Sequence, residues 1–203
     1  MTAGMRSTSR QVFVVVAIGL MVVALGVTSA VAANPGPSYP KAFKTLDRSQ
    51  RFALEEFPDV MAKDLRASKE LCKEAQTETD PVSAELAWQA LAQVVDTVDK
   101  PVWRSNIGAL RNVFDLLDDL RATFSEEWRG KPHKINTLRL GVARTEHGDS
   151  QFLEGIRRLA DAFDSWHQRD CAGAQQAINA ANEQDAKAIK KVNDGMEMLE
   201  SLR

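Results

Sequence analysis

Helical periodicity is the feature of this sequence that most restricts its fold. From about residue 41 to the C-terminus, apolar side chains recur at spacings of three and four residues, which places them on one face of an α-helix. The clearest series is Trp103, Ile107, Leu110, Phe114, Leu117, Leu120, Phe124 and Trp128. The sequence has no alternating run rich in β-branched and aromatic residues that would indicate a strand. These patterns predict an all-α fold.

Prolines, glycines and capping residues divide this pattern into helices. Asp80-Pro81 suits the start of a helix, and Lys100-Pro101 is expected to end it. Pro58 is expected to break or kink an earlier helix. Gly148 is expected to end another, with Asp149 or the following serine capping the next. The expected connections lie at residues 77–80, 99–101, 130–134, 148–150 and 168–170. Short connections join antiparallel neighbours, so we predict an up-and-down antiparallel bundle of four to six helices after an N-terminal signal segment.

The N-terminal segment has the composition of an export signal. Residues 12–27 carry no charge and follow Arg6 and Arg10, and small residues then form a cleavage site between Ala32 and Ala33. The sequence predicts a signal peptide over residues 1–32, and an uncleaved membrane anchor over residues 12–33 is the alternative. We therefore expect a secreted or periplasmic protein, in contact with a membrane only if this segment stays attached.

Residues 33–40 contain three prolines and a glycine and are expected to form an extended Pro-rich leader, followed by a helical bundle domain over residues 41–203. The whole chain has 26 basic and 28 acidic side chains. Without a basic excess, nucleic acid is not an expected partner. The expected partner is a protein or a small ligand.

Cys72 and Cys171 are the only cysteines in the sequence. An exported domain with two cysteines usually pairs them. Cys72 lies near the end of one predicted helix and Cys171 at the start of the last, so antiparallel packing brings both to the same end of the bundle. We predict a structural disulfide between them.

Three residues are candidates for metal binding. Asp164 and His167 lie three positions apart on a predicted helix, and Met61 is a candidate thioether ligand. A di-iron bundle needs a second carboxylate–histidine pair, which this sequence lacks. We therefore expect Asp164 and His167 to be surface or capping residues, with one bound metal ion as the alternative.

Asp185 lies on the apolar face of the last predicted helix, which runs from about Cys171 to Leu202. A buried carboxyl group must be paired or protonated. We expect a solvated end of the bundle or an arginine partner, such as Arg121 or Arg157, to satisfy it.

The segments Phe152-Leu153-Glu154-Gly155-Ile156 and Ala174-Gln175-Gln176-Ala177, together with the signal segment and the predicted bundle, resemble the cytochrome b562 family of exported four-helix haem proteins. The resemblance implies a four-helix bundle, and Met61 matches the family's haem-ligating methionine by position. The family's second ligand is a histidine in the last helix, whereas this chain has no histidine after His167.

No catalytic motif of a serine hydrolase, zinc protease, phosphate-binding loop or dinucleotide-binding fold occurs in the sequence. We therefore predict a non-catalytic binding or structural module that needs no cofactor. The alternative is a haem- or metal-binding bundle for electron transfer, with Met61, Asp164 and His167 as candidate ligands.

Overall fold

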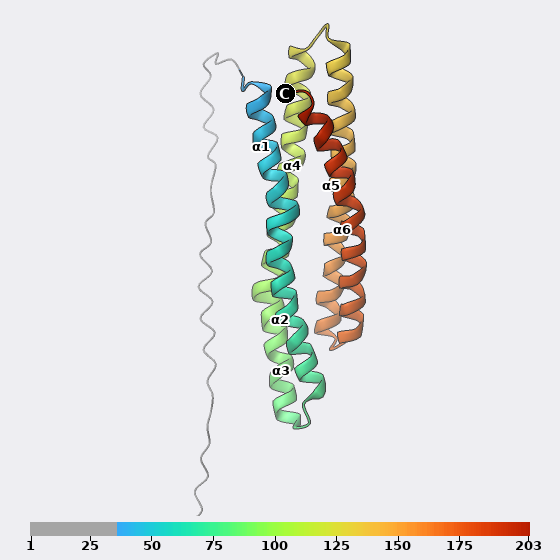
Figure 1. Cartoon of the computed structure of the whole chain (residues 1–203). Coiled ribbons are helices and arrows are strands. Elements are labelled where there is room, and N and C mark those ends of the chain that lie inside the picture. The colour runs from blue at the N-terminus through green and yellow to red at the C-terminus, as the bar shows by residue number, and fades with distance from the viewer. Residues whose placement is uncertain (1–35) are drawn as a thin grey trace, which may run out of the picture. The chain divides into compact units, whose positions relative to one another are not determined.

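Four helical rods form residues 36–203, which are the residues that the computed structural model describes (Figure 1). The first two rods each consist of two α-helices joined by a π-helical segment: α1 (Tyr39–Arg51), η1 (Phe52–Glu56) and α2 (Phe57–Thr77), then α3 (Pro81–Val94), η2 (Val95–Asp99) and α4 (Lys100–Glu127). The last two are α5 (Pro132–His167) and α6 (Cys171–Glu200). This part of the chain has no strand. The predicted all-α, up-and-down bundle is confirmed.

The helix end expected at Pro101 is not a turn, and of the break or kink expected at Pro58 the break is absent. Lys100-Pro101 was expected to end a helix, but α3 continues through η2 into α4, and α1 likewise continues through η1 past Pro58. A proline inside a helix lacks an N–H group, and its ring clashes with the carbonyl four residues earlier. Both prolines come within two residues after a π-helical segment. The wider turn of that segment accommodates the proline ring without ending the rod.

The expected helix end at Gly148 is also wrong, because α5 runs without interruption from Pro132 to His167. Asp149 is therefore not a helix cap but a fully buried residue in the middle of α5. Gly148 faces α6, where a Cβ atom at position 148 would lie 2.8 Å from the backbone nitrogen of Val192. The glycine is required by this close approach and not by a turn.

Small residues at seven-residue intervals bring α5 and α6 together. Gly141, Gly148 and Gly155 of α5 lie against the backbone of Gly195, Ala188 and Ala181 of α6, respectively. The buried Ala162 and Ala174 continue the two series toward the connecting turn. A repeat of seven residues keeps the same helix faces together along the whole length of a pair. Of all the element pairs, α5 and α6 share the most extensive contact.

Two apolar clusters fill the bundle along its length. One surrounds Phe124 and Leu138, and the other surrounds Phe163 and Trp166. Trp103 packs against both clusters, and its indole nitrogen donates a hydrogen bond of 2.7 Å to the carbonyl oxygen of Ile156. The hairpin of α2 and α3 extends beyond the turn between α5 and α6 (Figure 1).

The predicted disulfide is confirmed: Cys72 of α2 is bonded to Cys171 at the start of α6, and their Cα atoms are 5.9 Å apart. The predicted cap at Asp80 is also present, since its carboxylate accepts a hydrogen bond from the Ser83 amide. Asp170 caps α6 in the same way, because its carboxylate accepts a hydrogen bond from the Gly173 amide.

The first helix begins at Tyr39, two residues before the start that we expected for the bundle domain. The Tyr39 hydroxyl donates a hydrogen bond of 2.7 Å to the carbonyl oxygen of Leu199 and so attaches α1 to the end of α6. The predicted signal peptide and its Ala32/Ala33 cleavage site lie outside the described residues. None of the helices in residues 36–203 combines the length and the apolar composition that crossing a bilayer requires.

Candidate functional site

A cavity of about 250 Å³ lies where α2, α5 and α6 meet, at the junction of the two apolar clusters. Its apolar wall consists of Met61, Leu65, Phe152, Ile156, Leu159 and Ile178. An engineered protein cavity of roughly 150 Å³ binds benzene. The space between these helices is therefore large enough for a small organic molecule.

Polar side chains without hydrogen-bond partners also border this cavity. Asn106 of α4 is fully buried, and neither its amide nitrogen nor its amide oxygen has a partner within residues 36–203. One side-chain oxygen of Gln175 and one of Asp185, both on α6, also lack a hydrogen-bond partner within residues 36–203. Leaving a buried polar group unpaired costs about 1–3 kcal/mol. These groups make the cavity the leading candidate for a binding site.

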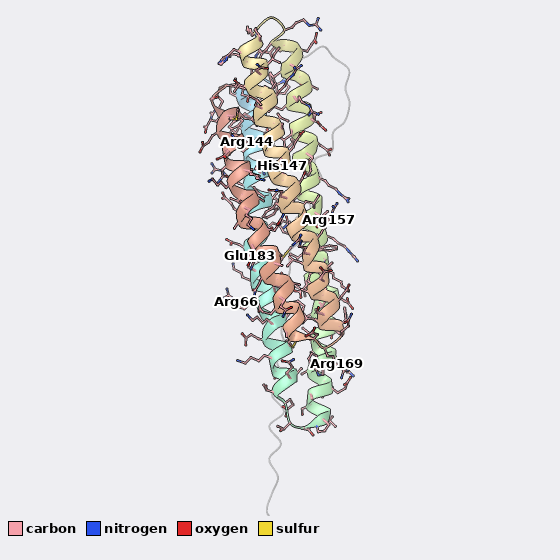
Figure 2. The ribbon with its side chains drawn as sticks, turned by 90° about the vertical axis from the view of Figure 1, so that its right-hand side faces the viewer. Arg66, Arg144, His147, Arg157, Arg169 and Glu183 are labelled. Atoms are coloured by element: carbon pink, nitrogen blue, oxygen red, sulfur yellow. A yellow bond between two sulfur atoms is a disulfide. The ribbon has the colours of Figure 1, made fainter. Side chains whose placement is uncertain are left out.

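Asp185 occupies a core position of α6. It belongs to a series of residues spaced seven positions apart, whose other members are Cys171, Ile178, Val192 and Leu199. Burial raises the pKa of its carboxyl group to about 7. The expected arginine partner is not found: Arg121 forms ion pairs with Asp118 and Glu146, and Arg157 projects from α5 away from α6 (Figure 2). Near neutral pH the cavity therefore contains a carboxyl group that is readily protonated.

The exposed residues of the cavity wall form its mouth: Ala62, Arg66 and Lys69 on α2 and Asn182 on α6. Arg66 extends from α2 next to α6 (Figure 2). None of the ion pairs within residues 36–203 involves Arg66 or Lys69. The mouth is thus positively charged, and its two cations are available to an anion.

Two almost fully buried aspartates pair with neutral side chains and do not border the cavity. Ser68 donates a hydrogen bond of 2.6 Å to Asp99, which connects the first two rods. Burial, with a smaller contribution from the negative charge of Asp64, raises the pKa of Asp99 to about 6. Ser68 opposes this shift.

The second pair connects the first rod to α5. Gln50 donates a hydrogen bond of 2.5 Å to Asp149. Burial and then the nearby Glu146 charge raise the pKa of Asp149 to about 7, against the opposing effect of the Gln50 hydrogen bond. Since each pair joins different rods deep in the bundle, we interpret both as contacts that align the helices.

The structure does not bring the three candidate metal ligands together. Met61 is buried in the cavity wall, whereas Asp164 and His167 are exposed on α5. His167 Nε2 lies 3.2 Å from the Asp96 carboxylate and 3.1 Å from Lys100 Nζ. Among the described residues, no group of three or more His, Cys, Asp or Glu side chains is placed to hold a metal ion.

Comparison with protein families, with curated proteins and with solved structures found no match to this chain.

Proposed function

We propose that this protein is an exported, non-catalytic binding module that holds a small molecule in the cavity between α2, α5 and α6. One observation carries the proposal: the amide of Asn106 is fully buried beside the cavity, and both of its polar atoms lack a partner within residues 36–203. Helical bundles commonly build their ligand sites between facing helices, with an apolar wall and a few polar groups that fix orientation.

The chemistry of the cavity wall supports binding over catalysis. The wall offers one carboxyl group, that of Asp185, and its other polar members inside the mouth are amides. Apart from the Lys69 amine at the mouth, no side chain of the wall is a usual nucleophile or proton carrier, since no hydroxyl, thiol or imidazole group borders this cavity. A wall of this composition suits the reversible binding of a ligand that undergoes no chemical change.

Two features support a location outside the cytoplasm. The first is the apolar segment at residues 12–27 with its downstream small residues. The second is the Cys72–Cys171 disulfide, since such bonds persist mainly in oxidising compartments. N-terminal sequencing of the protein from its native source tests this. A mature chain that starts at Ala33 supports export, and a retained residue 12–33 segment supports the membrane-anchored alternative.

Native mass spectrometry tests the binding proposal. The protein is purified under non-denaturing conditions from its native envelope fraction, as wild type and as Ala62→Trp. The indole at position 62 would cover the mouth of the cavity. Ala67→Trp is the matched control, because Ala67 is an exposed residue of α2 that does not border the cavity. We expect an additional mass on the wild type and the control but not on Ala62→Trp. Equal spectra for all three proteins would contradict the proposal.

A haem- or metal-binding bundle for electron transfer is the second candidate, and the position of Met61 in the cavity wall favours it. A thioether is a known axial ligand of haem. An optical spectrum and a metal analysis of the native protein separate the two candidates. A haem absorption band that Met61→Leu shifts would support this alternative, whereas a colourless, metal-free protein would exclude it.

A further inference from the structure

We infer, on the basis of the proposed function, that the ligand is a small amphipathic carboxylate that carries a neutral hydrogen-bonding group at its far end. Its carboxylate lies at the mouth with Arg66 and Lys69, its hydrocarbon part crosses the apolar wall, and its neutral end reaches Asn106. Three properties of the cavity carry this assignment.

The first property is the charge of the mouth. Arg66 and Lys69 are exposed, border the cavity and form no ion pair within residues 36–203. The inner end offers no cation, and an ionised carboxylate buried there without a partner would be strongly disfavoured. An anionic group is therefore stable at the mouth and unstable at the inner end, which fixes the direction of the ligand.

The second property is the apolar wall between the two ends. Met61 and Leu65 of α2 face this space together with Leu159 of α5 and Ile178 of α6. By comparison with the benzene-binding cavity, a volume of about 250 Å³ accommodates roughly ten non-hydrogen atoms. A hydrocarbon chain of medium length fits this requirement.

The third property is the unpaired amide at the inner end. The Asn106 side chain has two N–H donors and one carbonyl acceptor. A hydroxyl or amide group on the ligand can both donate a hydrogen bond to it and accept one from it. The polar atoms of Asn106 are covered, so the proposal requires the side chain to rotate toward the cavity when the ligand binds. Asn106 itself is neutral, so a neutral group on the ligand pairs with it without placing a charge in the interior.

Isothermal titration calorimetry with three probes of equal chain length tests the assignment: ω-hydroxyoctanoate, octanoate and octanediol. For the wild type we expect ω-hydroxyoctanoate to bind about tenfold more tightly than either of the others, because each lacks one of the two polar interactions. Circular dichroism confirms that each variant is folded.

Two variants separate the two ends of the site. Arg66→Gln/Lys69→Gln should weaken the binding of ω-hydroxyoctanoate and of octanoate about tenfold each. The affinity for octanediol should stay the same. Lys63→Gln/Lys73→Gln removes the same charge from exposed positions of α2 outside the cavity. This control should leave the affinities for all three probes unchanged. Asn106→Leu should remove the preference for ω-hydroxyoctanoate over octanoate.

The possible failures are distinguishable. If octanediol binds best, or if both charge variants behave alike, the ligand class is wrong and the binding cavity stands. The ligand class is also wrong if no probe binds while the native protein carries another molecule that Ala62→Trp loses. If no probe binds and the native protein carries no molecule, the proposed function fails as well.

Discussion

The backbone of Gly155 on α5 lies against the carboxyl group of Asp185 on α6, so a methyl group at position 155 would overlap with Asp185 Oδ1. The same oxygen has no hydrogen-bond partner within residues 36–203. A glycine at position 155 is thus what allows a carboxyl group to occupy this core position of α6. The contact couples the close packing of α5 and α6 to the chemistry of the cavity wall.

Gly155→Ala is expected to lower the free energy of unfolding by about 1–3 kcal/mol, because the new methyl group displaces Asp185. In an Asp185→Ala background the same substitution should be neutral or stabilise the protein by about 0.5–1 kcal/mol, as alanine is the better helix former. A double-mutant cycle in urea measures the difference. An identical effect of Gly155→Ala in both backgrounds would show that the two residues are not coupled.

Gly148→Ala is expected to destabilise the bundle by about 3 kcal/mol. The added Cβ would lie 2.8 Å from Val192 N and 3.0 Å from Ala188 O, and these backbone atoms cannot move unless the helices separate. Gly108 on α4 provides the control, because nothing lies within 4 Å of a Cβ atom there. Gly108→Ala should stabilise the protein by about 0.5–1 kcal/mol. Thermal unfolding that ranks the two variants in the opposite order would contradict the close approach of α5 and α6.

Stability should depend on pH through the buried aspartates. The pKa of Asp149 is raised from 3.8 to about 7 in the folded protein, so the folded state binds more protons than the unfolded state between these values. The stabilisation is complete below pH 3.8, decreases as the pH rises and is lost above about pH 7. For Asp149 alone we expect a loss of about 3 kcal/mol between pH 5 and pH 8.

Asp149→Asn removes this titration and can keep a hydrogen bond with Gln50. The variant should therefore be more stable than the wild type at pH 8 and show a flatter pH dependence in urea unfolding. Asp119→Asn, at an exposed position of α4, should leave the pH dependence unchanged. If the curves of Asp149→Asn and the wild type run parallel, Asp149 does not titrate in this range.

Removal of the disulfide should cost considerable stability. Cys72 and Cys171 are 99 positions apart, and closing a loop of this length contributes about 4.7 kcal/mol in the loop-entropy model. Cys72→Ser/Cys171→Ser should therefore unfold at a much lower urea concentration than the oxidised wild type. The reduced wild type should unfold at nearly the same urea concentration as the double variant. Equal stability of the oxidised wild type and the variant would contradict a structural role.

The sequence predicted the helices better than it predicted their ends. Caps such as Asp80 and Asp170 act through neighbouring residues, so local rules identify them. The signals at Pro101 and Gly148 were misread for different reasons. Pro101 is accommodated by a π-helical segment, and Gly148 serves the contact with α6. The contact of Gly148 depends on a neighbouring helix, which a local pattern does not show.

The candidate site was only partly predictable. Asp185 was recognised on the apolar face of the last helix, but Asn106 was missed. Asn106 belongs to a seven-residue series that continues with the buried Val113 and Leu120, so its polar side chain interrupts a core position. That signal becomes informative only when the packing of α4 against its neighbours shows which series faces the core.

The central claim is that the buried amide of Asn106 meets a ligand in the cavity, and NMR of the side-chain amides of the ¹⁵N-labelled protein tests it most directly. The Asn106 signal is assigned through Asn106→Leu, and the protein is titrated with the small-molecule fraction released from the native protein. We predict that this signal shifts while that of the exposed Asn193 on α6 does not. An Asn106 signal that stays in place while the fraction binds would contradict the account.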